Sequence, residues 1–153
     1  MFKDTRKISE TGAWVHVKDG YRGAYLEGED GQPDESKPIR IKMLGPDSDT
    51  LQRRARKRVA SRLRASGGNI DLSKMSEDQI EAMLENNSSS LAENMADATL
   101  TWENMPNPDN PSEMLAFSPE AAEDLYIRFP AIARQLKHEG GEIDDFLALA
   151  SKS

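Results

Sequence analysis

The stretch PIRIKML, residues 38–44, sets the pattern from which the fold can be predicted. The apolar side chains of Ile39, Ile41 and Met43 stand at every second position, with Arg40 and Lys42 between them. Because successive side chains of a β-strand point to opposite faces, this alternation predicts a strand with one buried face. The stretch AWVHVK, residues 13–18, alternates in the same way. We therefore expect two half-buried strands within residues 1–46.

The segment between these strands, residues 21–37, is rich in Gly, Asp and Glu. A short strand is expected at residues 24–26, followed by a turn at Asp30 and Gly31, because these residue types favour turns. Together the segments predict a small antiparallel β-meander over residues 1–46. Two or three strands are marginal alone, so we expect their apolar face to pack on a helix or on a partner's sheet.

Residues 47–66 form the second expected region, a strongly basic helix. Ser48 and Asp49 stand at its start, where their side chains can accept the free N–H groups of a first helical turn. A spacing of four residues places apolar side chains on one narrow stripe of a helix. The residues with this spacing are Leu51, Ala55, Val59 and Leu63.

Residues 67–153 form the third expected region, which we predict to be mostly helical. The capping box Ser-Glu-Asp-Gln at residues 76–79 predicts a helix start. Apolar residues continue at helical spacing as far as Trp102, which predicts one long helical face. Three prolines within residues 105–111 then predict a loop.

Further helix signals follow the proline-rich loop. Ser118 followed by Pro119 predicts an N-cap and the first helical position. Pro130 forbids a smooth continuation and predicts the start of another helix, and residues 142–150 predict a last one. The patterns together predict an α+β fold, with a small N-terminal antiparallel β-meander followed by a mostly α-helical region of four to five helices.

The overall composition excludes several classes of protein. The chain has 153 residues, no cysteine and a formal net charge of −7, so a disulfide framework is excluded. No stretch approaches the roughly 18 consecutive apolar residues of a membrane span, and the N-terminus has no apolar export signal. We therefore expect no membrane association and a cytoplasmic protein. With 31% charged residues, we also expect a modest core that a partner completes.

The sequence contains no motif typical of an enzyme. Its two histidines, His16 and His138, are far apart, and without cysteine they do not form the ligand set of a zinc site. There is no glycine-rich phosphate loop, no nucleophile elbow and no calcium-binding loop. We therefore predict a non-enzyme with no catalytic residues, no metal and no cofactor.

The basic helix supplies the first set of candidate partner-binding residues. Seven of the 20 basic residues lie between positions 53 and 64, and all 27 acidic residues lie elsewhere, so the rest of the chain carries a charge of −14. The helix could contact phosphates, dock an acidic partner or remain a solvated face. Nucleic acid is not expected, because the remaining charge opposes its approach. The candidates are Arg53, Arg54, Lys57, Arg58 and Arg62.

Aromatic residues around the proline-rich loop supply the second set of candidates. One interpretation is a small core that fixes the loop between helices. The other is an exposed aromatic patch that captures a peptide or another subunit. The residues of this set are Trp102, Phe117, Tyr126 and Phe129.

Several short stretches of the sequence resemble those of a known family. They are ATLTWEN at 98–104, LAFSPEAA at 115–122, Leu125-Tyr126, FPAI at 129–132, Gln135 and DFL at 145–147. In this order they resemble the C-terminal half of the tail assembly chaperones of long-tailed bacteriophages. The stretch IKMLGPDSD at 41–49, which leads into an Arg-rich helix, is similar to the front half of that family. The resemblance spans about residues 13–149.

The resemblance implies a non-catalytic assembly factor in the host cell cytoplasm. Such a protein binds the long, apolar, helical tape measure protein, keeps it soluble and helps recruit subunits of the tail tube protein. It is typically absent from the finished virion. The resemblance assigns no binding residues. Under this reading we expect residues 76–150 to supply apolar contacts, and the basic helix to engage acidic segments of a partner or of a neighbouring copy.

Two alternatives remain open at the level of sequence. One is a structural virion component, such as a head-tail connector or a tail completion protein, in which the same elements are part of a ring. The other is a small DNA-binding regulator that uses the basic helix. Self-association of the chain also remains open.

Overall fold

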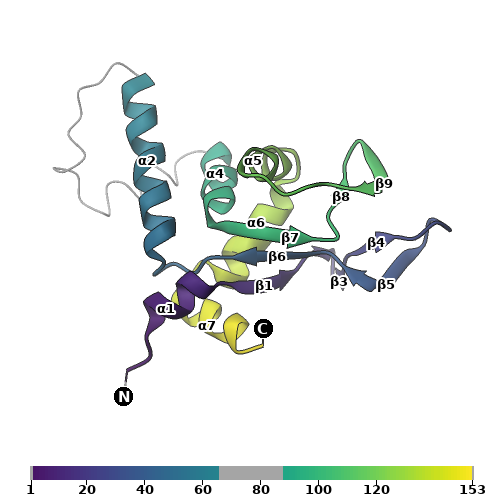
Figure 1. The fold of residues 1–153 in the computed structure, drawn as a ribbon, viewed down its shortest axis with the longest axis horizontal. Coiled ribbons are helices and arrows are strands. Elements are labelled where there is room, and N and C mark those ends of the chain that lie inside the picture. The colour runs from purple at the N-terminus through teal and green to yellow at the C-terminus, as the bar shows by residue number, and fades with distance from the viewer. Residues whose placement is uncertain (1, 66–87, 153) are drawn as a thin grey trace.

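The computed structural model describes residues 2–65 and 88–152 and has an α+β fold (Figure 1). N-terminal antiparallel strands are followed by helices, which confirms the predicted fold class. The helices are α1 (Thr5–Thr11), α2 (Asp49–Ala65), α4 (Ser88–Ala98), α5 (Pro119–Arg128), α6 (Pro130–Gly140) and α7 (Ile143–Lys152). The strands are β1 (Ala13–His16), β2 (Lys18–Asp19), β3 (Arg22–Gly23), β4 (Tyr25–Glu27), β5 (Pro33–Pro38), β6 (Arg40–Met43), β7 (Thr99–Glu103), β8 (Pro106–Asn107) and β9 (Asn110–Met114).

The central sheet has three antiparallel strands in the order β1-β6-β7, so the PIRIKML stretch supplies its middle strand. Val15 on β1 lies opposite Ile41 on β6, which in turn lies opposite Trp102 on β7. These side chains are at most 7% exposed and join a core cluster with α5, α6 and α7. The predicted alternation of buried and solvent-facing positions is therefore confirmed for both strands.

The other face of the sheet is polar. On β6, Arg40 and Lys42 alternate with the buried residues and are partly exposed. The Arg40 guanidinium lies 4.9 Å from the ring centre of Trp14 on β1 and forms an ion pair with Glu103 on β7. Cation–π and cross-strand charge pairs of this kind stabilise a solvated sheet face modestly.

Strand β7 corrects the prediction of a helix that extends to Trp102. Helix α4 ends at Ala98, and residues 99–103 pair with β6. Thr99 and Thr101 are β-branched and Trp102 is aromatic, and such residues favour a strand when a partner strand is available. Pairing with β6 therefore overrides the helical structure that the spacing of the apolar residues indicated. The predicted helix start at residues 76–79 lies outside the described residues.

The proline-rich segment is more regular than the predicted loop at 105–111. Its prolines stand in a two-stranded hairpin, in which Pro106 on β8 lies opposite Met114 on β9. The side chain of Asn107 accepts a hydrogen bond of 3.0 Å from the amide of Asp109 and so orders the turn. Proline is tolerated here because the strands are short and lie at an edge.

The predicted helix signals after this hairpin are confirmed. The Ser118 hydroxyl accepts a hydrogen bond of 3.0 Å from the amide of Ala121, and Pro119 occupies the first turn of α5. Pro130 begins α6, as its fixed backbone conformation predicts. Leu136 on α6 and Phe146 on α7 are at most 1% exposed and complete the core.

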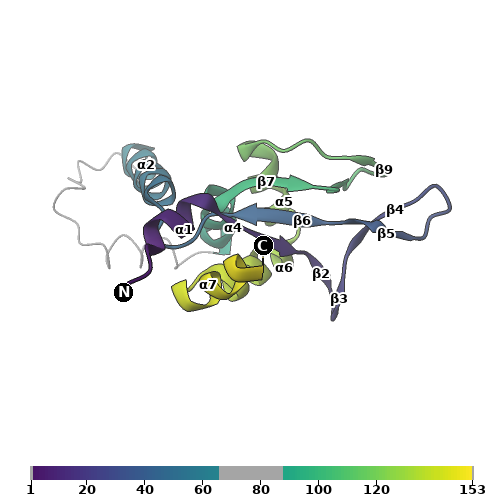
Figure 2. The same ribbon diagram turned by 60° about the horizontal axis from the view of Figure 1, so that its bottom comes forward.

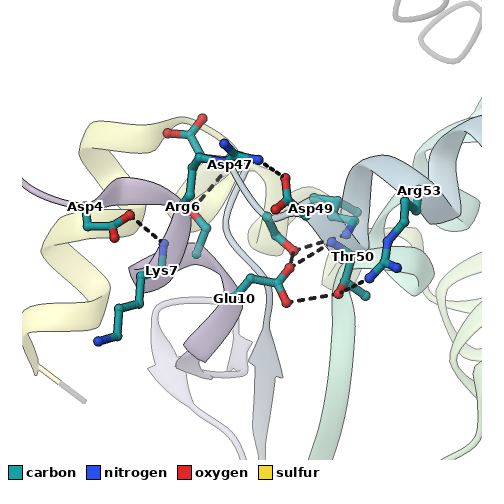
Figure 3. A network of polar contacts seen from close by, with 11 residues as sticks. Asp4, Arg6, Lys7, Glu10, Asp47, Asp49, Thr50 and Arg53 are labelled. Carbon is teal, nitrogen blue, oxygen red and sulfur yellow. Dashed lines mark hydrogen bonds and ion pairs between the residues drawn. The ribbon is translucent and has the colours of Figure 1, made fainter.

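Helix α1, which the sequence analysis did not predict, is fixed to the start of α2 by polar contacts (Figure 3). The Glu10 carboxylate accepts hydrogen bonds from the Thr50 amide at 2.8 Å, from the Thr50 hydroxyl at 3.0 Å and from the Ser48 hydroxyl. Arg6 forms an ion pair of 2.6 Å with Asp49. Glu10 thus serves as an N-terminal cap for α2 that comes from another helix.

Candidate partner-binding groove

The basic helix of the sequence analysis is α2, and its apolar stripe faces the molecule as predicted. Val59 and Leu63 are 1% and 6% exposed, while Leu51 and Ala55 are half-buried. Because this stripe is turned inward, the basic residues around it divide into those that border the interior and those that point to solvent.

Two of the candidate arginines serve the fold. The Arg58 guanidinium binds both carboxylate oxygens of Asp97 on α4, at 2.7 and 2.9 Å, and lies 3.3 Å from Glu123 on α5. Bidentate pairs of this type are among the stronger charge-assisted hydrogen bonds. They raise the pKa of Arg58 above its ordinary value, the hydrogen bond to Asp97 being the largest cause. Arg62 is paired with Glu93 on α4.

The other three basic candidates are exposed. Arg53 donates a hydrogen bond of 3.3 Å to the Thr50 hydroxyl within its own helix. Arg54 donates one of 2.9 Å to the backbone carbonyl of Asp97, near the C-terminal end of α4. Lys57 forms no ion pair with any residue in the described part of the chain. Arg54 and Lys57 therefore present positive charge to solvent beside α4.

Arg54 and Lys57 line an open groove between α2, the end of α4 and the segment that leads into α5. We call it the α2 groove, and its volume is about 410 Å³. One wall is basic and the opposite wall is largely apolar. The lining residues are Arg54, Lys57, Arg58, Ser61, Ala96, Asp97, Thr99, Leu100, Phe117 and Pro119.

The aromatic candidates separate into core and surface residues. Trp102 donates a hydrogen bond of 2.8 Å to the carbonyl of Leu115 and is 7% exposed. Tyr126 is fully buried, with its hydroxyl 2.7 Å from that of Thr99, and burial raises its pKa above the ordinary value. Phe117 stacks edge-to-face on Trp102, with ring centres 5.0 Å apart.

The two interpretations of the aromatic set therefore apply to different residues. Trp102 and Tyr126 belong to the core and present no surface to a partner. Phe117 is half-buried and lines the α2 groove. Phe129 is 40% exposed at the junction of α5 and α6, and it does not line the groove.

The groove thus joins Arg54, Lys57 and Arg58 of the basic set to Phe117 of the aromatic set. Leu100 completes the apolar wall of the groove. It was missed from the sequence because position 100 does not lie on the apolar face of the helix that was expected there. Strand alternation would not have indicated this position either, because Thr99 and Leu100 both line the groove although they are neighbours in β7, where the pairing with β6 shifts its register.

The chemistry of the α2 groove suits binding. Its lining offers cationic and hydroxyl donors, while its one carboxylate, Asp97, is already bonded to Arg58. A segment with apolar side chains and an acidic flank would complement both walls. In the described residues, no cluster of three or more histidine, aspartate or glutamate side chains is placed to hold a metal ion.

No protein-family model matches this chain, and neither does any curated protein or solved structure with which it was compared. Within residues 2–65 and 88–152, none of the helices combines the length and the apolar character that a membrane span requires.

Proposed function

We propose that this protein is a non-catalytic tail assembly chaperone of a long-tailed bacteriophage. In this role it binds and solubilises the tape measure protein and helps recruit tail tube subunits during tail morphogenesis. It acts in the host cell cytoplasm and does not remain in the mature virion. The resemblance over residues 13–149 supports the class of protein, and the α2 groove supports the mode of binding.

The observation that carries the proposal is the pairing of a basic wall with an apolar wall in one open groove. An amphipathic helix in this groove would place apolar side chains against Leu100 and Phe117. Acidic side chains on its flank would approach Arg54 and Lys57, both of which are exposed. A long, apolar, helical client provides many segments of this kind, and covering them would keep the client soluble.

The basic residues favour this role over DNA binding. Arg58 and Arg62 are engaged by carboxylates of α4 and α5, so they are not available to neutralise phosphates. The positive charge that remains exposed belongs to a chain with a net charge of −7. An acidic protein segment of limited length suits such a site better than the continuous charge of a duplex.

Co-expression with the tape measure protein tests the proposal. We expect the chaperone to raise the soluble yield of the client and to co-purify with it. The double variant Arg54→Glu/Lys57→Glu should lower the affinity about tenfold, because two favourable charge contacts become repulsive. The variant Arg134→Glu/Lys152→Glu makes the same change in net charge at exposed sites outside the groove and serves as the control.

Two results would contradict the proposal: an unchanged soluble yield of the client, or wild-type binding by the groove variant. Mass spectrometry of purified particles addresses the structural alternative, in which the chain is a connector or completion protein. A chaperone is missing from those particles, whereas a structural component is present in fixed stoichiometry.

A further inference from the structure

Opposite charges are gathered at opposite ends of this molecule. Helix α2 and the β4–β5 hairpin lie at the two ends of the long axis, as both Figure 1 and Figure 2 show. Between residues 49 and 65 the chain has seven basic residues and one acidic residue. Between residues 27 and 37 it has five acidic residues and one basic residue, which gives a charge of −4. Because these segments are far apart, they do not neutralise each other within one copy.

The β4–β5 hairpin, which we call the acidic hairpin, is ordered by its own backbone. The amide of Gly28 donates to the carbonyl of Gln32 at 2.8 Å, and the carboxylate of Asp30 accepts from the amide of Gln32 at 3.1 Å. Gly31 has a φ of 74°, which a residue without a Cβ adopts most readily. The turn is therefore preorganised, and ordering it on a partner costs little.

The carboxylates of the acidic hairpin are available to a partner. Glu27, Glu29, Asp30 and Glu35 are exposed, and Asp34 is partly exposed. None of the five forms an ion pair with a residue in the described ranges. Their negative charge is therefore presented to solvent at the far end of the molecule from α2.

Helix α2 presents a matching surface. With 3.6 residues per turn, positions 53, 57 and 64 fall within a narrow sector of the helix, opposite the buried stripe that contains Val59. We call Arg53, Lys57 and Arg64 the basic face, and all three are exposed. The Arg58 and Arg62 side chains point to α4 instead, where they are paired.

We propose that the acidic hairpin of one copy docks on the basic face of a second copy, head to tail. The charge complementarity of the two surfaces defines the partner as another copy of this chain. Such a contact is heterologous, so each added copy leaves one hairpin and one basic face unoccupied at the ends. The contact therefore repeats into rings or open chains. It is weak and salt-sensitive, because exposed ion pairs carry it.

This self-association does not depend on the proposed chaperone function. Lys57 belongs to both the basic face and the α2 groove, so an acidic client segment and the hairpin of a neighbour compete there. The acidic hairpin, by contrast, has no part in the groove. A variant of the hairpin therefore separates self-association from client binding.

Sedimentation equilibrium over a range of protein concentrations tests the proposal. At low ionic strength we expect the average mass to rise with concentration above the 17.0 kDa of one copy. In roughly 1 M salt, where the screening length is about 3 Å, we expect the mass to return to that of a monomer. A monomer at every concentration in low salt would overturn the proposal.

Charge-reversal variants locate the contact. The hairpin variant Glu29→Lys/Glu35→Lys and the helix variant Arg53→Glu/Lys57→Glu should each remain monomeric when alone. Mixed together, they should associate, because the intact hairpin of the helix variant meets the intact basic face of the hairpin variant and the two reversed surfaces are also complementary. The variant that combines all four substitutions restores complementarity and should associate like the wild type.

The control variant Asp124→Lys/Asp144→Lys changes the net charge as much as the hairpin variant does, at exposed positions on α5 and α7. It should associate like the wild type. Wild-type association of the hairpin variant or of the helix variant alone, or a mixture of the two that stays monomeric, would refute the head-to-tail contact. Client binding by the hairpin variant is expected to stay at the wild-type level, so its loss would bear on the chaperone proposal alone.

Discussion

Arg58 shows how one residue of a basic cluster can be committed to the fold. Its side chain is 23% exposed, and it faces carboxylates from two helices: Asp97 and Glu93 on α4, and Glu123 on α5. If the guanidinium were absent, these like charges would repel one another in a partly desolvated site. The residue therefore couples α2 to both helices.

Substitution of Arg58 should be costly. We expect Arg58→Ala to lower the free energy of unfolding by about 2 kcal/mol, less than the roughly 3–5 kcal/mol of a fully buried pair because water screens this site. Arg64→Ala, at an exposed position of the same helix, should change it by less than about 0.5 kcal/mol. Urea denaturation followed by circular dichroism measures both, and equal costs would contradict the assignment.

Glu10 should make the stability of the fold depend on pH. Hydrogen bonds from the Ser48 hydroxyl and from Thr50 hold the pKa of Glu10 below its ordinary value of 4.5. A lowered pKa in the folded state means that the stabilisation is present above the unfolded pKa and is lost as the pH falls through the folded one. The contact between α1 and α2 should therefore weaken in acid.

The variant Glu10→Gln tests this dependence. Urea denaturation at about pH 6 and about pH 3 should show a smaller loss of stability in the variant than in the wild type, because the variant has no proton to gain at this site. The variant Glu142→Gln, at an exposed carboxylate that has no part in the polar contacts between α1 and α2, is the control and should follow the wild type. Identical pH profiles for all three proteins would exclude Glu10 as a source of the dependence.

At the scale of elements, β1 is an edge strand of the central sheet, and a side chain covers the C-terminal end of its open edge. The Gln135 amide on α6 donates a hydrogen bond of 2.9 Å to the carbonyl of His16 and accepts one of 2.9 Å from the amide of Lys18. This pairing imitates a neighbouring strand. Covering an edge in this way prevents unwanted pairing with another chain.

Removal of the Gln135 amide should expose the edge. We expect Gln135→Ala to lower the free energy of unfolding by about 2 kcal/mol, since two hydrogen bonds are lost. Hydrogen exchange at the Lys18 amide should become faster, while exchange at amides between β6 and β7 should follow only the change in global stability. Unchanged protection of Lys18 would show that the edge is covered by something else.

At the scale of the whole molecule, the central sheet combines strands from two of the three regions that were expected from the sequence. Strand β6 belongs to residues 1–46, and its partner β7 belongs to residues 67–153. The core cluster likewise runs from Ala13 on β1 to Phe146 on α7. The two regions therefore bury their apolar faces against each other, which supplies the helical support that the small meander was expected to need.

A shared core should unfold as one unit. In the Trp102→Phe background, Trp14 on β1 is the remaining tryptophan and reports on the N-terminal strands. Adding Leu136→Ala on α6, where the side chain is 1% exposed, should cost about 2–5 kcal/mol. The urea midpoints measured by Trp14 fluorescence and by circular dichroism should decrease by the same amount and remain equal. Separate midpoints would mean that the regions fold independently.

Local signals in the sequence determined several of the elements. The alternation in residues 13–18 and 38–44 identified β1 and β6, and the pattern Ser118-Pro119 located the start of α5. The four-residue stripe of α2 correctly placed its buried face. Each of these signals depends on near neighbours in the chain, because strand faces, helix stripes and caps are set by local geometry.

Only the tertiary structure decided which pairs of distant segments meet. It turned residues 99–103 into a strand, because β6 offers backbone partners that no local spacing reveals. It also gave the basic residues of α2 different environments. Carboxylates of α4 and α5 engage Arg58 and Arg62, whereas Lys57 stays exposed in a groove with Phe117. The sequence by itself thus determined the elements with strong local signals, such as β1, β6, α2 and α5, whereas strand β7 and the placement of the charge required contacts between residues far apart in the chain.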